Sequence, residues 1–140
     1  MKRLFERHEA EVAGLLPRGR KTIASGSKYE KSDVVRLGAW GLLVECKSTQ
    51  SAGFRVTRSL WKLARDRAYN RSVDLRPALA IRFYGPTKTI ETTKVIHDLV
   101  IIDLEDFTEL IHEIDALRAV KNGTELARTI EQNDLETQQE

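Results

Sequence analysis

The chain has 140 residues, 41% of them hydrophobic and 31% charged, which suits one compact domain with a hydrophobic core and is too short for two. It has no run of about 18 apolar residues, and its first residues turn polar and acidic where a signal peptide would be apolar. We therefore expect a cytoplasmic protein with no membrane partner. The single cysteine, Cys46, excludes an internal disulfide, and its place in an apolar segment favours a buried small side chain.

The formal net charge of +2 is unevenly distributed along the chain. Residues 1–103 carry 20 Lys and Arg against 11 Asp and Glu, a balance of +9. Residues 104–140 carry 3 against 10, a balance of −7. The sequence therefore favours a polyanionic partner for the basic part of the chain and not for the acidic part.

The first predicted element is a helix that begins near Leu4 and is ended by the Pro-Arg-Gly-Arg segment at residues 17–20. Glu9 falls on the apolar stripe of this helix. Buried carboxylates are rare unless they are paired or bound to a metal, so Glu9 is a candidate site residue, and an exposed position at the edge of the stripe is the alternative. Glu6 and Glu11 look more solvated, and each stays an option for the helix carboxylate.

A short strand at residues 21–24 leads into a polar and basic loop, residues 25–31, with the sequence Ser-Gly-Ser-Lys-Tyr-Glu-Lys. Ser hydroxyls, Gly amides and the ammonium groups of Lys28 and Lys31 are all donors that phosphate accepts. The loop therefore suits a phosphate path, although a common surface loop has the same composition.

The most informative residues are Asp33, Glu45 and Lys47. Residues 32–47 are typical of a β-hairpin with a three-residue turn at 38–40, and such a turn places Asp33 opposite Glu45. Opposed side chains lie about 4.5 to 5.5 Å apart at Cβ, where like charges repel unless a cation lies between them. Because side chains alternate along a strand, Lys47 points to the same face as Glu45. The pattern therefore predicts a hard divalent cation beside a lysine.

These residue types match the needs of phosphodiester hydrolysis. Asp33 and Glu45 are predicted to bind Mg²⁺, with Mn²⁺ as a substitute, and the metal supplies the Lewis acid. The backbone carbonyl of Cys46 and the carboxylate of Glu9 are further predicted ligands. Lys47 is predicted to orient the attacking water or to offset developing negative charge. The alternative is a strand-end salt bridge between Glu45 and Lys47 without chemistry.

Beyond residue 47 the sequence predicts a loop over residues 48–53, a helix over 57–70, strands over 77–83 and 95–102, and a helix whose apolar side runs from Phe107 to Leu117. Asp106 and Glu109 match a capping box at the start of this last helix, and Gly123 is predicted to end it. The predicted single domain spans residues 1–120, and residues 121–140 form a polar tail or a short helix.

Arg58, Lys62 and Arg65 form a basic stripe at spacings of four and three residues. A solvated helix face is one interpretation, and a ridge that faces phosphates is the other. With Lys28 and Lys31, these residues form the predicted DNA-binding set.

Together these features resemble the PD-(D/E)xK nuclease superfamily, and more narrowly the archaeal and phage Holliday junction resolvases. The resemblance covers about residues 9–83, over half the chain. It rests on the helix glutamate Glu9, the Ser25-Gly26-Ser27-Lys28 loop, Asp33, the strand end at 43–48 and the closing strand at 77–83. Ser32 stands where the superfamily name has a proline, a residue that shapes the turn and does no chemistry.

The resemblance implies an α/β fold of the restriction-endonuclease type, with a mixed central sheet flanked by helices. It also implies a homodimer without a small-molecule cofactor that makes paired, Mg²⁺-dependent nicks in branched DNA, namely four-way junctions, in the host cytoplasm if a phage encodes it. Active-site roles for Glu9 and Ser25 beside Asp33, Glu45 and Lys47 follow from the resemblance.

Paired cuts need two identical sites at a fixed spacing, which a two-fold dimer provides. The apolar options for its interface are Trp40, Trp61 and the helix from Phe107 to Leu117, each of which is more often part of a core.

Two alternatives stay open. One is another endonuclease of the same superfamily, with a repair, nicking or restriction-like role, because substrate preference depends on dimer geometry and surface shape. The other is a non-catalytic DNA-binding module with this fold. Intact Asp33, Glu45 and Lys47 argue against the second alternative.

Overall fold

The computed structural model describes residues 3–22, 33–87 and 89–139. The chain divides into two compact units, Met1–Asp103 and Leu104–Glu140. The first unit contains the sheet, and the second consists of a single helix.

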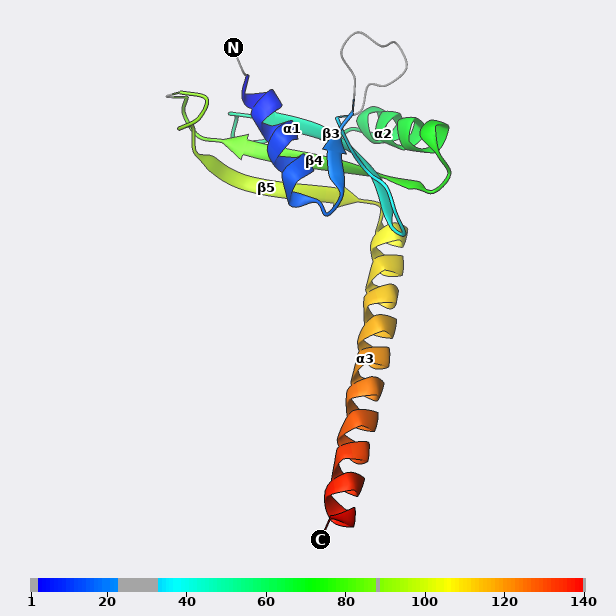
Figure 1. Ribbon diagram of the computed structural model, residues 1–140. Helices are drawn as coiled ribbons and strands as arrows, with labels where there is room; N and C mark the ends of the chain where they lie inside the picture. Colours follow the sequence, from blue (N-terminus) through cyan, green and yellow to red (C-terminus); the bar gives the residue numbers. More distant parts are fainter. Residues whose placement is uncertain (1–2, 23–32, 88, 140) are drawn as a thin grey trace. The chain divides into compact units, whose positions relative to one another are not determined.

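The first unit is built on one five-stranded sheet in the order β1-β2-β3-β4-β5 (Figure 1). The strands are β1 (Gly19–Lys21), β2 (Val34–Arg36), β3 (Gly41–Thr49), β4 (Leu75–Tyr84) and β5 (Val95–Ile102). β3 and β4 are parallel, and the other neighbouring strands are antiparallel. The predicted α/β class with a mixed sheet is therefore confirmed.

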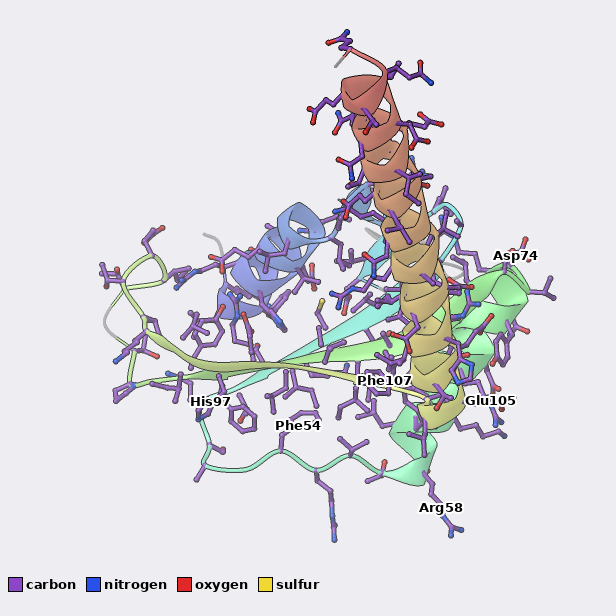
Figure 2. The ribbon with its side chains drawn as sticks, turned by 90° about the horizontal axis from the view of Figure 1, so that it is seen from below. Phe54, Arg58, Asp74, His97, Glu105 and Phe107 are labelled. Carbon is purple, nitrogen blue, oxygen red and sulfur yellow. The ribbon has the colours of Figure 1, made fainter. Side chains whose placement is uncertain are left out.

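Two helices, α1 (Leu4–Leu15) and α2 (Arg58–Arg71), cover opposite faces of this sheet (Figure 1). Alternation along the strands sorts the core residues between them. The face toward α1 buries Val34, Val44, Cys46, Ala78 and Ala80. The face toward α2 buries Val35, Leu43, Leu75, Leu79 and Ile81 against Ala64 and Ala68. Phe54, on the segment before α2, directs its side chain toward that same face (Figure 2).

The hairpin of β2 and β3 has the predicted register, because Val34 pairs with Val44 and Arg36 pairs with Leu42. Gly38 in its turn has a φ of 123°, in the left-handed region that only glycine adopts without strain. The ladder ends at Val34, so Asp33 lies just beyond the paired residues.

Several predicted boundaries are wrong by a few residues. The strand predicted at 21–24 is observed as β1, Gly19–Lys21, and β4 begins at Leu75, two residues before Pro77. Pro77 pairs in parallel register with Leu43 inside β4, so it does not open the strand. α2 ends one residue after the predicted helix, at Arg71.

The second unit is one continuous helix, α3 (Leu104–Gln138), of 35 residues. Gly123 was predicted to end it and does not. A single glycine in an exposed helix costs only about 1 kcal/mol relative to alanine, so it weakens a helix without necessarily ending it. The predicted capping box is also wrong, because Asp106 lies inside the first turn and not at the N-cap. No described residue of α3 is buried.

Candidate functional site

The four residues predicted from their chemistry, Glu9, Asp33, Glu45 and Lys47, meet in one pocket of about 510 Å³. It lies where β3 continues beyond its last residue pair with β2. The pocket is lined by Phe5, Glu9, Asp33, Glu45, Cys46, Lys47, Ser48 and Arg67. Residues from α1, the start of β2, β3 and α2 are thus brought to one place by the sheet.

Asp33 is held at the end of β2 by two hydrogen bonds to β3. Its backbone N–H donates to the carbonyl of Val44 at 3.1 Å, and its Oδ2 accepts the backbone N–H of Cys46 at 2.7 Å. Burial raises the pKa of the Asp33 carboxyl to about 6, against the hydrogen bond from Cys46, and the carboxylates of Glu45 and Glu9 raise it further. The pocket therefore disfavours the charged form of Asp33 beside the carboxylates of Glu45 and Glu9.

Glu45 lies on the face of β3 toward α2 and is only 5% exposed. Both of its carboxylate oxygens accept from Nη1 of Arg67, at 2.8 and 2.9 Å. Nζ of Lys47 lies 3.5 Å from Oε1 of Glu45, which confirms that the two side chains point to the same face. A buried carboxylate of this kind requires a counter-charge, and here two cations provide it.

Arg67 was not among the predicted site residues. Its sequence signal is the one that singled out Glu9, a charged residue on an apolar helical stripe, because it lies three residues after the buried Ala64 and next to the buried Ala68. The sequence does not indicate that the partner of Arg67 is Glu45, which lies 22 residues away on β3.

Of the three glutamates in α1, Glu9 is the one that lines the pocket. Its Oε2 lies 3.4 Å from Nζ of Lys21. Glu6 instead accepts the backbone N–H of Arg3 at the start of the helix, and Glu11 pairs with Arg7 and Arg82.

Cys46 is 8% exposed within the core cluster on the α1 side, as predicted for a small buried side chain. Burial raises the pKa of its thiol well above the ordinary range, so the side chain stays protonated. The backbone carbonyl of Cys46, and not its thiol, is the group that the prediction concerns.

The other predicted residues fall into two groups. Ser25, Lys28 and Lys31 lie outside the described residues. Arg58, Lys62 and Arg65 are exposed on α2, and the Arg58 side chain extends away from the sheet at the start of that helix (Figure 2).

The aromatic candidates for an interface have partners within the first unit. Trp61 packs against the core beneath α2, and the guanidinium of Arg76 stacks 4.5 Å from the ring centroid of Trp40. On α3, in contrast, Phe107, Ile111 and Leu117 are 47%, 39% and 70% exposed.

A second cluster of charges, which the sequence did not predict, lies on the α1 face. The guanidinium of Arg82, only 2% exposed, forms two parallel hydrogen bonds of 2.7 Å with Asp98 and also contacts Glu11. Beside it, His8 is 1% exposed, and its Nε2 lies 3.9 Å from Oδ1 of Asp98. This Arg82 cluster joins α1, β4 and β5.

The pocket provides the donor types that Mg²⁺ prefers, namely carboxylate oxygens and a backbone carbonyl. In the part of the chain that the structure describes, however, no group of three or more His, Cys, Asp or Glu residues is arranged to hold a metal ion. In addition, Arg67 hydrogen-bonds both oxygens of Glu45. The pocket residues are of the types that bind Mg²⁺. To bind a metal, Glu45 would have to exchange its hydrogen bonds with Arg67 for bonds to the ion.

Comparisons with protein-family models, with curated proteins and with solved structures found no match. Among the described helices, none is both long and apolar enough to cross a membrane.

Proposed function

We propose that the protein is a metal-dependent DNA endonuclease that acts as a homodimer and nicks four-way junctions. The observation that carries this proposal is the convergence of Glu9, Asp33, Glu45 and Lys47 on one pocket. Their identities and spacing are those that resemble the PD-(D/E)xK nucleases. A carboxyl with a raised pKa beside a specific cation is also typical of functional sites, although structural ion pairs perturb pKa values too.

Asp33 and Glu45 would hold the metal, with the Cys46 carbonyl and Glu9 as further ligands. When bound, Mg²⁺ or Mn²⁺ supplies a Lewis acid for a phosphoryl oxygen and lowers the pKa of a bound water. Lys47 has a side chain that is 37% exposed, so its ammonium group can reach both Glu45 and an incoming phosphate. It orients the water or stabilises the negative charge that develops during cleavage.

Binding of DNA is supported by the charge of residues 1–103, which is +9, and by the exposed basic stripe on α2. Neutralising phosphates releases counterions, so affinity should fall steeply with salt, by about 10³-fold between 50 and 200 mM for six contacts. Lys62→Gln should reduce the slope of log affinity against log salt concentration by about one, because one phosphate contact is lost. A flat salt response would count against the basic surface.

The choice of a four-way junction, and of a dimer with two sites, rests on the resemblance to junction resolvases. The deciding experiment is cleavage of an end-labelled immobile four-way junction and of a matched linear duplex, with Mg²⁺, Mn²⁺ or EDTA. Glu45→Gln removes a predicted ligand, and Glu91→Gln, at an exposed position outside the pocket, is the matched control.

Symmetric nicks in the junction alone, dependent on metal and on Glu45, would support the resolvase. Cleavage of both substrates would favour another endonuclease of the same chemistry. Tight binding without cleavage would instead favour a DNA-binding module with this fold.

A further inference from the structure

Arg67 hydrogen-bonds the carboxylate of Glu45, which the proposed function assigns to the metal. Any role of Arg67 in metal binding therefore rests on that function. Nη1 of Arg67 lies 2.8 Å from Oε1 and 2.9 Å from Oε2 of Glu45. The side chains are 23% and 6% exposed, so the pair is largely removed from water. Lys47, at 3.5 Å, is the weaker of the two partners of Glu45.

This arrangement meets a physical need that a metal ion would also meet. A carboxylate buried as deeply as Glu45 is unstable without a cation beside it, and charge-assisted hydrogen bonds to an arginine are among the strongest that a protein offers. A divalent ion on the same two oxygens would lie against the guanidinium, and the two positive charges would repel each other. Arginine and metal are therefore alternative partners of one carboxylate.

We infer that Arg67 is a positioning residue that competes with the divalent cation for Glu45. Without metal, Arg67 holds the Glu45 carboxylate in the pocket, and metal binding displaces the guanidinium from it. The competition weakens the affinity for metal, because part of the binding free energy is used to break the existing pair.

The displaced guanidinium would still line the pocket, next to Lys47. A planar guanidinium is suited to bidentate contact with a phosphate. When metal binds Glu45, the released guanidinium of Arg67 can therefore bind a DNA phosphate in the pocket. Because coupling between two ligands is reciprocal, DNA should raise the affinity for metal and metal should raise the affinity for DNA.

The test is a calorimetric titration with Mn²⁺ alone, in the absence of DNA. Arg67→Gln should bind Mn²⁺ about tenfold more tightly than the natural chain, within the usual range for coupling between two ligands. Arg67→Lys keeps the charge but replaces the guanidinium, whose Nη1 contacts both oxygens of Glu45, with a compact ammonium group, so its affinity should lie between the two. Arg55→Gln removes the same charge from an exposed position and should bind as the natural chain does.

A stability measurement separates competition from a purely structural role. In EDTA, Arg67→Gln should unfold at a lower temperature than the natural chain, because Glu45 loses its counter-charge. With saturating Mn²⁺ this difference should shrink, because the metal replaces the arginine. If Arg67→Gln does not fold in EDTA, Arg67→Lys provides the same comparison.

Equal or weaker Mn²⁺ affinity of Arg67→Gln, with clear binding by the natural chain, would overturn the competition and leave the metal site standing. An equal loss of stability with and without Mn²⁺ would also overturn it. If neither the natural chain nor any variant binds Mn²⁺, the inference and the proposed metal site fail together.

Discussion

Two clusters of charge lie on the same sheet, the Arg82 cluster on its α1 face and the pocket where β3 continues beyond β2, and the pKa values of their carboxyl groups are shifted in opposite directions. In the Arg82 cluster, a hydrogen bond from Arg82 lowers the pKa of Asp98. Burial raises the pKa of Glu11, but hydrogen bonds from Arg7 and Arg82 outweigh it and hold that pKa below its ordinary value. In the pocket, burial and the neighbouring carboxylates raise the pKa of Asp33 to about 6.

The difference shows which cluster is complete. A lowered pKa means that the fold stabilises the charged carboxylate, so the carboxylates of the Arg82 cluster are compensated by its arginines, and the cluster joins α1, β4 and β5. The raised pKa of Asp33 means that the pocket stabilises its neutral form, mainly because the carboxyl is buried and secondarily because Glu45 and Glu9 lie near it. A cation bound beside Asp33 would favour its charged form, which is the reason to place the proposed metal in the pocket and not in the Arg82 cluster.

Removing a pocket carboxylate should produce the largest effect on activity. We expect Glu45→Gln to reduce the cleavage rate at least about 10³-fold, because charge stabilisation by the metal contributes several kcal/mol. Junction binding should be kept or strengthened, since a negative charge facing phosphate is lost. Single-turnover cleavage and gel-shift binding test both parts. Lost junction binding in a folded Glu45→Gln protein would contradict the metal-site assignment.

Removing Arg82 should mainly affect folding. Arg82→Met leaves Asp98 and Glu11 without their shared partner, and we expect a loss of about 3 kcal/mol in the free energy of unfolding. Both carboxylates are 41% exposed, so water offsets part of the penalty and the loss should not be larger. Urea unfolding measures it. Loss of cleavage by Arg82→Met at unchanged stability would contradict the purely structural role of the Arg82 cluster.

The two clusters should also give opposite pH dependences of stability. Burial, with the charge of Arg82, lowers the pKa of His8 to about 4 from 6.5, while Asp98 and Glu11 oppose this shift. The unfolded chain therefore takes up a proton on His8 before the folded chain does, and stability falls as the pH drops from about 6.5 to about 4.

For Asp33 the sign is reversed. The folded chain keeps its proton up to about pH 6, whereas the unfolded chain loses it near 3.8, so stability falls as the pH rises between these values. The two shifts are of similar size and their contributions have opposite signs, so in the natural chain they largely cancel.

Variants separate these opposing contributions. Between pH 4.5 and 6.5, Asp33→Asn should become more stable as the pH rises, and His8→Leu should become less stable. Asp98 and Glu11, with lowered pKa values, titrate below this range. Urea unfolding at the two pH values measures both slopes. Equal slopes in the two variants would show that the clusters do not differ in the way described.

The smallest effect is expected for Lys47. Lys47→Ala should lower the cleavage rate by about 10- to 100-fold, since general electrostatic assistance is lost while the metal ligands remain. Mn²⁺ binding, followed by calorimetry, should persist. Loss of the Mn²⁺-binding heat in Lys47→Ala would mean that Lys47 holds the carboxylates in place. Lys47 would then have a structural role in the pocket, as Arg82 has in its cluster.

The local features of the pocket could be read from the sequence, because they depend on short-range periodicity. The turn around Gly38 sets the register of β2 and β3, and the alternation of side chains puts Glu45 and Lys47 on one face. The buried position of Cys46 follows from the same alternation. Element ends were less predictable, because Pro77 lies inside β4 in parallel register with Leu43, and the small cost of one glycine does not end α3 at Gly123.

The chemical groups of the pocket, and the strand face that Glu45 and Lys47 share, follow from the order of residues alone. Their partners do not, because Arg67 reaches Glu45 across 22 residues and Arg82 reaches Glu11 across 71. Such pairs depend on how helices pack over the sheet, and one residue of rotation in a helix would change them. Both the pocket and the Arg82 cluster contain acidic residues and an arginine, and their different packing decides whether the pKa of a carboxyl is raised, as for Asp33, or lowered, as for Asp98.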